Sequence, residues 1–512
     1  MGAISRRCVC IHRQGKLKRG TVGYVCRRPQ SAAVGFHDRT ADRESHTRAA
    51  GLVVKAKPSE SRNGQIGNPV YRSGKLYHHG SNPDKVGSWW TVHSDKSPNS
   101  VGEKAFLSHS LSCRRQFLGS AGAATLALTS VPALADTVVK LLLPGGPDER
   151  PMTTAFPQKG ALILQRTRPP LLETPFEVFD QSVLTPNDRF YVRWHWAVIP
   201  TAVNVDTFRL TVHGHINQTL SLSLNDILAL PRVELVAINQ CSGNSRGYFQ
   251  PRVPGGEWSH GAMGNARWTG VLLKDVLDRA GVKAGAIQVR FNGIDEPVVP
   301  DAPDFMKSLD IAHARDGEVM LAYAMNGDQL PLLNGFPLRL IVPGWYSTYW
   351  VKMLNDIEVL DQPDTNYWTK TAYTIPDTPR ADIRPGETDV KFVPISRMVP
   401  RSFITNIKEG DTLQVGASTL ARGIAFGGDS GVSRVDFSSD GGKSWQAAAL
   451  GTDEGKYSFR QWQHRFTPPT KGDQVLMVRC TSSGGEAQPD TPNWNPSGFM
   501  RNVIERTAVV VA

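Results

Sequence analysis

The residues best suited to chemistry stand in one short stretch, residues 233–248, which reads V-E-L-V-A-I-N-Q-C-S-G-N-S-R-G-Y. Its apolar, β-branched first half predicts a buried strand that ends just before Asn239. The Gly-Asn pair that follows predicts a tight loop with positive φ. Arg246 adds a cation five residues after the thiol, and a nearby cation stabilises a thiolate. Because thiolate is a preferred ligand of soft metals, the stretch predicts a metal-binding loop, although an isolated buried Cys is more often an inert core residue.

The sequence N-Q-C-S-G-N-S-R in this stretch resembles the molybdenum-ligand loop of the sulfite oxidase family. The family pattern is Cys, a small residue, Gly, Asn, any residue and Arg. Four further segments match in the same order: Y-V-R-W-H at 191–195, G-G-E-W at 255–258, N-G-F-P-L-R at 334–339 and W-V-K at 350–352. Five motifs in register, extending with the C-terminal region from about Phe176 to the end of the chain, are far more specific than one.

The resemblance implies a molybdenum held by a single pterin dithiolene, oxo groups and the sulfur of Cys241. Lys352 and Arg339 match positions that supply charge to the pterin phosphate. Asn334 stands where the animal enzymes carry His, so the resemblance implies the same contact from a different donor. The cofactor-binding residues implied are Tyr191, Val192, Arg193, Trp194, His195, Cys241, Asp295, Asn334, Arg339, Trp350, Val351 and Lys352.

The resemblance also implies a pocket for a small oxyanion beside the metal. Guanidinium groups suit this task because they stay charged and donate in a planar fork. The family's third arginine closely follows a Trp-Asn pair, but here that pair is followed by Pro-Ser-Gly, and the next arginine is Arg501. A solvated surface charge is an equally good account of Arg501. The catalytic residues implied are Arg193, Cys241, Arg246, Trp258, Tyr373 and Arg501, with a structural aromatic as the alternative for Trp258.

Composition and patterning divide the chain into six segments that must position these residues. We expect a basic segment without a folded core at 1–105, a twin-arginine signal peptide at 106–135, an extended arm at 136–175, a mixed α+β domain at 176–361, a connection at 362–391 and an immunoglobulin-like domain at 392–512. The resemblance implies that the domain at 176–361 is the molybdopterin-binding catalytic domain and that the domain at 392–512 mediates dimerisation. The overall fold class is α+β, with a mixed α/β domain followed by an all-β sandwich.

Short strands and helices alternate in the predicted catalytic domain. Strands are expected at 208–212, 233–238, 288–291 and 338–342, and helices at 225–230 and 272–280. Ser223 is the expected N-cap of the first helix, and Gly281 ends the second.

Alternating apolar residues predict the strands of the C-terminal domain. A hairpin is expected around Asp440-Gly441-Gly442, and Cys480 is expected in the core.

The net charge of +11 at pH 7 would by itself suggest a polyanion-binding protein. Residues 1–100, however, contain 18 Lys or Arg against 6 Asp or Glu, so most of the charge lies there. The remainder from residue 136 onward is slightly acidic. We therefore predict no nucleic-acid binding by the folded part of the chain.

An export signal is predicted from the sequence R-R-Q-F-L that begins at Arg114. A Gly- and Ala-rich run follows and closes on A-L-A at 133–135, an A-x-A cleavage site. The run is too short and too rich in small residues for a transmembrane anchor. We predict twin-arginine export to the periplasm, a mature N-terminus near Asp136 without a membrane span, and a false translation start for residues 1–100.

These features together predict an exported molybdenum sulfite dehydrogenase that oxidises sulfite and passes electrons to a cytochrome c. We expect a homodimer or a heterodimer with a haem subunit. No C-x-x-C-H motif or strand-linked G-x-G-x-x-G occurs, so neither haem nor flavin is expected in this chain. The alternatives are a sulfane dehydrogenase subunit of a sulfur-oxidation system, a sulfoxide reductase of the same fold, and a non-catalytic exported sandwich protein.

Overall fold

The computed structural model describes residues 137–512. The segments predicted at 1–105 and 106–135, including the signal peptide, lie outside the described residues. No helix between residues 137 and 512 is long and apolar enough to cross a bilayer. The described chain is rich in strands, and its few helices are short.

The first described residues form a sheet. Five strands pair in sequence order: β1 (Val138–Lys140), β2 (Glu149–Thr153), β3 (Leu162–Arg166), β4 (Leu171–Glu173) and β5 (Val192–Arg193). This differs from the extended arm expected at 136–175, because the apolar residues of β3 and β4 are buried and need a packed partner. Leu162 and Leu172 are fully buried. The sheet matters for the site because β4 pairs with β5 and so fixes Arg193 opposite Leu171.

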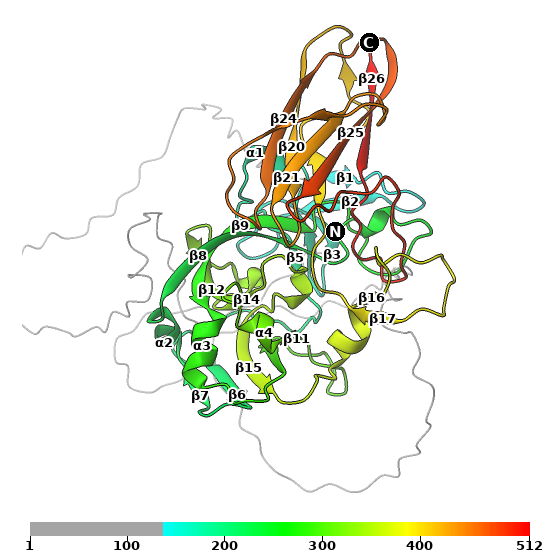
Figure 1. Ribbon diagram of the computed structural model, residues 1–512. Coiled ribbons are helices and arrows are strands. Elements are labelled where there is room, and N and C mark those ends of the chain that lie inside the picture. Colours follow the sequence, from blue (N-terminus) through cyan, green and yellow to red (C-terminus); the bar gives the residue numbers. More distant parts are fainter. Residues whose placement is uncertain (1–136) are drawn as a thin grey trace, which may run out of the picture. The chain divides into compact units, whose positions relative to one another are not determined.

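Two further sheets build the catalytic domain (Figure 1). The first has the order β11 (Met306–Asp310), β10 (Gln288–Gly293), β15 (Leu354–Leu360), β6 (Leu210–Gly214) and β7 (Leu220–Leu222). The second has the order β13 (Asp328–Gln329), β12 (Met320–Met325), β9 (Met263–Leu272) and β8 (Arg232–Gln240), with β14 (Arg339–Ile341) paired to β12. All four strands predicted in this domain are present, with ends shifted by a few residues.

Local sequence signals set the helix ends. The helix α2 (Leu224–Leu228) begins at Ser223, whose side chain and that of Asp226 form a reciprocal capping box. The helix α3 (Leu273–Ala280) ends at Gly281, which adopts the left-handed conformation with φ 70°. Both predicted helices are therefore confirmed. The remaining α-helices, α1 (Val178–Gln181) and α4 (Ile311–Ala314), are single turns.

The C-terminal region is an all-β sandwich, whose strands run from yellow through orange to red in Figure 1. One sheet has the order β18 (Arg401–Ile404), β20 (Thr419–Phe426), β24 (Arg460–Phe466) and β23 (Ala449–Leu450); the other has β19 (Thr412–Leu413), β26 (Glu505–Val511), β25 (Gly472–Ser482), β21 (Val432–Ser438) and β22 (Gln446–Ala447).

Residues from both sheets share one core, which contains Trp462 and Val478. Cys480 lies fully buried in it, as predicted, and burial raises the pKa of its thiol to about 12. The predicted hairpin is also confirmed, because β21 and β22 pair across Gly441 and Gly442.

The sandwich and the catalytic domain share packed contacts. Phe403 and Phe459 of the sandwich belong to the main core of the catalytic domain, and Phe459 packs edge-on against Phe179 at 5.7 Å. At the surface, Arg422 of β20 forms an ion pair with Asp180 of α1 at 2.6 Å. The C-terminal domain is thus packed against the strands that position the site.

Candidate active site

Cys241 lies directly after the carboxyl end of β8, where the sequence predicts the metal-binding loop. Its amide donates to the Ala262 carbonyl at 2.9 Å, and the residue is 6% exposed. It opens into a cavity. The cavity is lined by Tyr191, Arg193, His195, Asn239, Cys241, Ser242, Phe305, Leu333, Asn334, Arg339, Ser347, Thr348, Lys352 and Tyr373. Eight of the predicted site residues are in this lining.

Positive charge dominates the cavity. Arg193, Arg339 and Lys352 line it, and no lining residue is Asp or Glu. Burial and the neighbouring Arg339 lower the pKa of Lys352 to about 7, although Asp295 opposes the shift. Cations without nearby anions are destabilising in a buried site, so this arrangement calls for an anionic ligand.

Several polar atoms of the lining are buried without a partner among the described residues. They are Arg193 Nη1, Asn239 Nδ2, Ser242 Oγ, Arg339 Nε and Thr348 Oγ1. Buried polar groups in native proteins are nearly always hydrogen-bonded, so these atoms are expected to meet a ligand. A pterin phosphate would meet the cations and the unpartnered donors, and a soft metal would meet the Cys241 sulfur. The residues present therefore fit a molybdenum–pterin group.

Backbone carbonyls hold Arg339 in place, and an aromatic ring packs against Lys352. Arg339 donates from Nη1 to the Asn334 carbonyl at 2.8 Å and from Nη2 to the Trp350 carbonyl at 3.3 Å. The Lys352 ammonium lies 4.4 Å from the centre of the Trp194 ring. Trp194, Trp350, Val192 and Val351 are buried but do not line the cavity. These four predicted cofactor residues support the pocket wall from behind.

His195 and Tyr373 share a hydrogen bond of 2.6 Å in the cavity wall. The His195 ring also stacks on Phe305, with ring centres 3.5 Å apart. Burial lowers the pKa of His195 well below its usual value, and nearby Arg193, Lys352 and Lys307 lower it further. Burial raises the pKa of Tyr373. At neutral pH the two groups are therefore an uncharged pair that can pass a proton.

Arg246 lies beside the pair of His195 and Tyr373, and its side chain passes close to several glycines. Its Nε donates to the Ser497 carbonyl at 3.3 Å, and its guanidinium carbon lies 5.2 Å from the centre of the Phe499 ring. The Phe499 ring in turn stacks on Tyr373 at 5.4 Å. A Cβ atom at Gly243 would lie 2.5 Å from Nη2 of Arg246.

The predicted positive φ in the Gly-Asn pair is wrong. The left-handed residue in this loop is Ser245, with φ 68°. Gly243 is needed instead because the Arg246 side chain passes over it. Gly255 and Gly498 are similarly close to that side chain.

Comparisons with known proteins agree with this site. The model of the oxidoreductase molybdopterin binding domain matches residues 196–368, and that of the Mo-co oxidoreductase dimerisation domain matches residues 393–512. Sulfite oxidase of Gallus gallus is 32% identical over 382 residues, covering 71% of this chain and 81% of that protein. Sulfite oxidase of Arabidopsis thaliana is 30% identical over 378 residues, covering 68% and 94%. This chain belongs to the sulfite oxidase family.

Family members differ in length and in their sequence identity to this chain. Human mitochondrial sulfite oxidase is 36% identical over 369 residues, and the match spans 69% of this chain and 66% of the human protein. The solved structure of the sulfane dehydrogenase SoxCD from Paracoccus pantotrophus has the same fold, with a TM-score of 0.56 and 24% identity. That match covers 66% of this chain and 84% of the SoxCD chain.

Besides Arg246 and the four residues behind the pocket wall, three more predicted site residues of this family member do not line the cavity. Arg501 forms an ion pair with Glu505 at 3.1 Å, and it is the Ser497 carbonyl that accepts a hydrogen bond from Arg246. Trp258 is fully buried in the main core. Asp295 lies behind Lys352, and burial raises the pKa of its carboxyl to about 6.

Sequence reasoning missed two buried lysines close to the cavity. Lys159 donates to Asn334 Oδ1, and Lys307 lies 5.4 Å from the centre of the Tyr373 ring. Burial lowers the pKa of each to about 7. No motif surrounds either residue. Among the other lining residues, Asn239 and Ser242 flank Cys241 in the recognised loop and could have been found.

Lys352 provides a test of the anion site. Its pKa is 10.5 in an unfolded chain and about 7 in the fold, so the unfolded state holds more protons between these values. The stability of the cofactor-free protein should therefore rise with pH across this range. Lys352→Met should flatten that rise, stabilise the cofactor-free protein at pH 7 and reduce pterin retention. Melting temperature against pH, with pterin content of the loaded protein, measures both effects.

The exposed Lys370→Met is the matched control and should change neither quantity. Full pterin retention by Lys352→Met would contradict the assignment of Lys352 to the anion site.

Proposed function

We propose that this protein oxidises sulfite to sulfate at a molybdenum–pterin centre bound through Cys241. The observation that carries the proposal is a single cavity containing a buried thiol, an excess of cations and unpartnered donors. The reaction takes one oxygen from water: SO₃²⁻ + H₂O gives SO₄²⁻, two protons and two electrons. When bound, the cofactor supplies the two-electron redox change and the oxygen transfer. The electrons then pass to a separate cytochrome c.

Two guanidiniums are proposed to bind the oxyanion. Arg193 has a buried, unpartnered Nη1 in the lining, and Arg246 lies beside Phe499 next to Tyr373. Such groups can hold sulfite in one orientation by charge-assisted hydrogen bonds. Trp258 supports the Arg246 loop from the core, since its carbonyl accepts from the Gly247 amide at 3.0 Å.

Proton release is assigned to the neutral pair of His195 and Tyr373. Their hydrogen bond of 2.6 Å offers a direct path for a proton leaving the reacting centre. Burial and the nearby cations, including Lys307, lower the pKa of His195 and keep its ring neutral, so it can relay a proton to or from Tyr373 without retaining it.

The C-terminal sandwich is proposed to be immunoglobulin-like and to mediate self-association. Its order of four and five strands in two facing sheets supports the first point. The match to a dimerisation domain supports the second. The twin arginines at 114–115 support export to the periplasm, where the acceptor would be a soluble cytochrome or a haem subunit.

Replacing the thiolate tests the metal site. Cys241→Ser exchanges a soft ligand for a hard hydroxyl, so sulfite oxidation should fall to background. Pterin binding should persist in part, because Arg339 and Lys352 hold it independently. Steady-state kinetics with molybdenum and pterin content measure the effect. Cys480→Ser, at the other buried thiol, is the control and should keep activity. Near-native sulfite oxidation by Cys241→Ser would exclude Cys241 as the metal ligand.

Arg246→Gln tests substrate binding. A hydrogen bond to a charged group contributes about 1.5–3 kcal/mol, so kcat/KM for sulfite should fall roughly 10- to 100-fold with molybdenum content unchanged. The loss should appear mainly as a higher KM. Arg232→Gln, at the opposite end of β8, is the control and should leave kcat/KM unchanged. An unaltered kcat/KM in Arg246→Gln would remove Arg246 from the proposed site.

Export can be tested on the precursor. Replacing both Arg114 and Arg115 by Lys should leave the protein in the cytoplasm, because the twin-arginine machinery reads the guanidinium pair. Cell fractionation and N-terminal sequencing of the mature protein are the measurements. An N-terminus near Asp136 is expected, and a mature protein that retains residues 1–100 would refute both the export site and the false start.

A further inference from the structure

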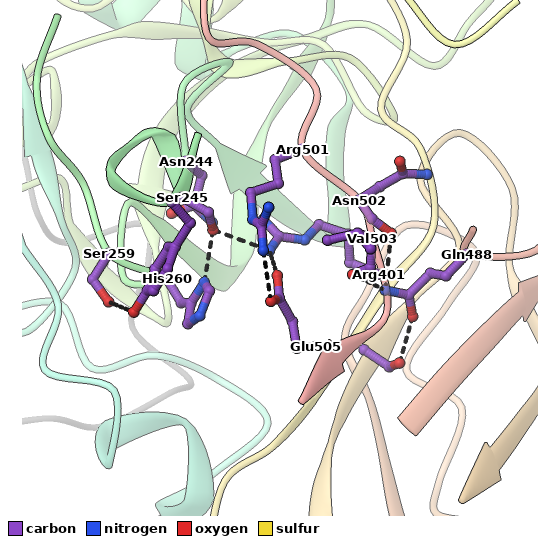
Figure 2. A network of polar contacts seen from close by, with 12 residues as sticks. Asn244, Ser245, Ser259, His260, Arg401, Gln488, Arg501, Asn502, Val503 and Glu505 are labelled. Atoms are coloured by element: carbon purple, nitrogen blue, oxygen red, sulfur yellow. Dashed lines mark hydrogen bonds and ion pairs between the residues drawn. The ribbon is translucent and has the colours of Figure 1, made fainter. Parts of the chain in front are cut away.

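A buried cluster of polar side chains joins the C-terminal sandwich to the loop that carries Arg246 (Figure 2). Its centre is Arg401, the first residue of β18, whose side chain is fully buried. One nitrogen of Arg401, Nη2, donates to Ser245 Oγ at 3.0 Å and to Glu505 Oε1 at 2.9 Å. A charged group of the sandwich therefore directly contacts the residue before Arg246.

The donor and acceptor in each hydrogen bond of the cluster follow from the single proton of the Ser245 hydroxyl. Its hydroxyl accepts from Arg401, so its single proton is free to be donated to His260 Nδ1, which lies 2.7 Å away. Burial lowers the pKa of His260 to about 3, so the neutral ring can accept that proton. Ser245 is thus held by hydrogen bonds on two sides. One is to Arg401 of the sandwich, and the other is to His260 in the segment just before β9.

The fixed position of Ser245 sets the path of the loop. Ser245 has φ 68°, and its amide donates to the Ser259 carbonyl at 2.7 Å. A non-glycine residue in this conformation is held there by its surroundings. The next residue is Arg246, whose side chain rests on Ser497 and Phe499. The C-terminal region therefore holds both the backbone before Arg246 and the side chain of Arg246.

The cluster contains more buried charged groups than are needed to hold the two domains together. Burial would raise the pKa of Glu505, but the charges of Arg501 and Arg401 lower it to about 2. Nε and Nη1 of Arg401 are buried without a partner among the described residues. Aromatic packing such as Phe179 against Phe459 already joins the domains. A buried ion pair is weak support for stability and better suited to fixing one conformation.

We propose that Arg401 and Glu505 are positioning residues that set the conformation of Arg246 through the Ser245 hydroxyl. The C-terminal domain then has a second role besides association, because it determines how tightly the active site binds the oxyanion. The proposal rests on the proposed sulfite oxidation, and it concerns residues that touch neither substrate nor cofactor.

A double-mutant cycle on the loaded enzyme tests the coupling. Ser245→Ala and Arg401→Met should each raise KM for sulfite roughly 3- to 30-fold, with kcat and molybdenum content near those of the parent. The KM of the double variant should not exceed that of the single variant with the higher KM, because both changes break the same contact. Additive effects of the two substitutions would overturn the proposal.

The ion pair between Arg422 and Asp180 is the matched control. It joins the same two domains at 2.6 Å but makes no contact with the Arg246 loop. Arg422→Gln should leave KM for sulfite unchanged, even if the melting temperature falls. A rise in KM equal to that of Arg401→Met would mean that general loosening of the domain contact explains both variants, and the positioning role would be rejected.

Hydrogen exchange provides a measurement that does not depend on activity. In the full-length loaded protein, Ser245→Ala should speed amide exchange in residues 241–248, and Arg422→Gln should not. If the parent protein fails to oxidise sulfite, the proposed function fails while this measurement still reports on positioning. If Arg401→Met does not fold, Glu505→Gln replaces it, and unchanged exchange and KM in both Ser245→Ala and Glu505→Gln would refute the proposal.

Discussion

The site depends on the burial of positive charge that the protein itself does not neutralise. Arg193, Arg339 and Lys352 line the cavity, and Lys159 and Lys307 lie close behind it. Burial lowers the pKa of all three lysines to about 7, because removal from water disfavours their charged form. An anionic cofactor relieves that cost. Folding and loading of this protein are therefore linked by electrostatics.

The three described sheets of the catalytic domain and its N-terminal extension bring these charges to one place. The chain places Cys241 at the end of β8 and Arg193 on β5, while Lys352 follows the loop after β14. The sheet at the start of the described chain has a direct part in this, since β4 fixes β5. This sheet, which reaches the cavity lining only through β5, thus controls the position of Arg193.

The two sides of the active site belong to different parts of the chain. The cofactor side is built by the catalytic domain alone, through the backbone contacts that hold Arg339. The substrate side is completed by the C-terminal region, whose Ser497 and Phe499 support Arg246.

The sequence by itself determined the features that local chemistry controls. The N-cap at Ser223, the glycine end at Gly281 and the hairpin before β22 all followed from short-range preferences, and the motif around Cys241 identified a loop that lines the cavity. Only the tertiary structure decided where long side chains point. Arg501 turned to Glu505, the two buried lysines came from segments without a motif, and Gly243 proved necessary for close approach instead of positive φ. These outcomes depend on contacts between residues far apart in the chain, which local patterns do not encode.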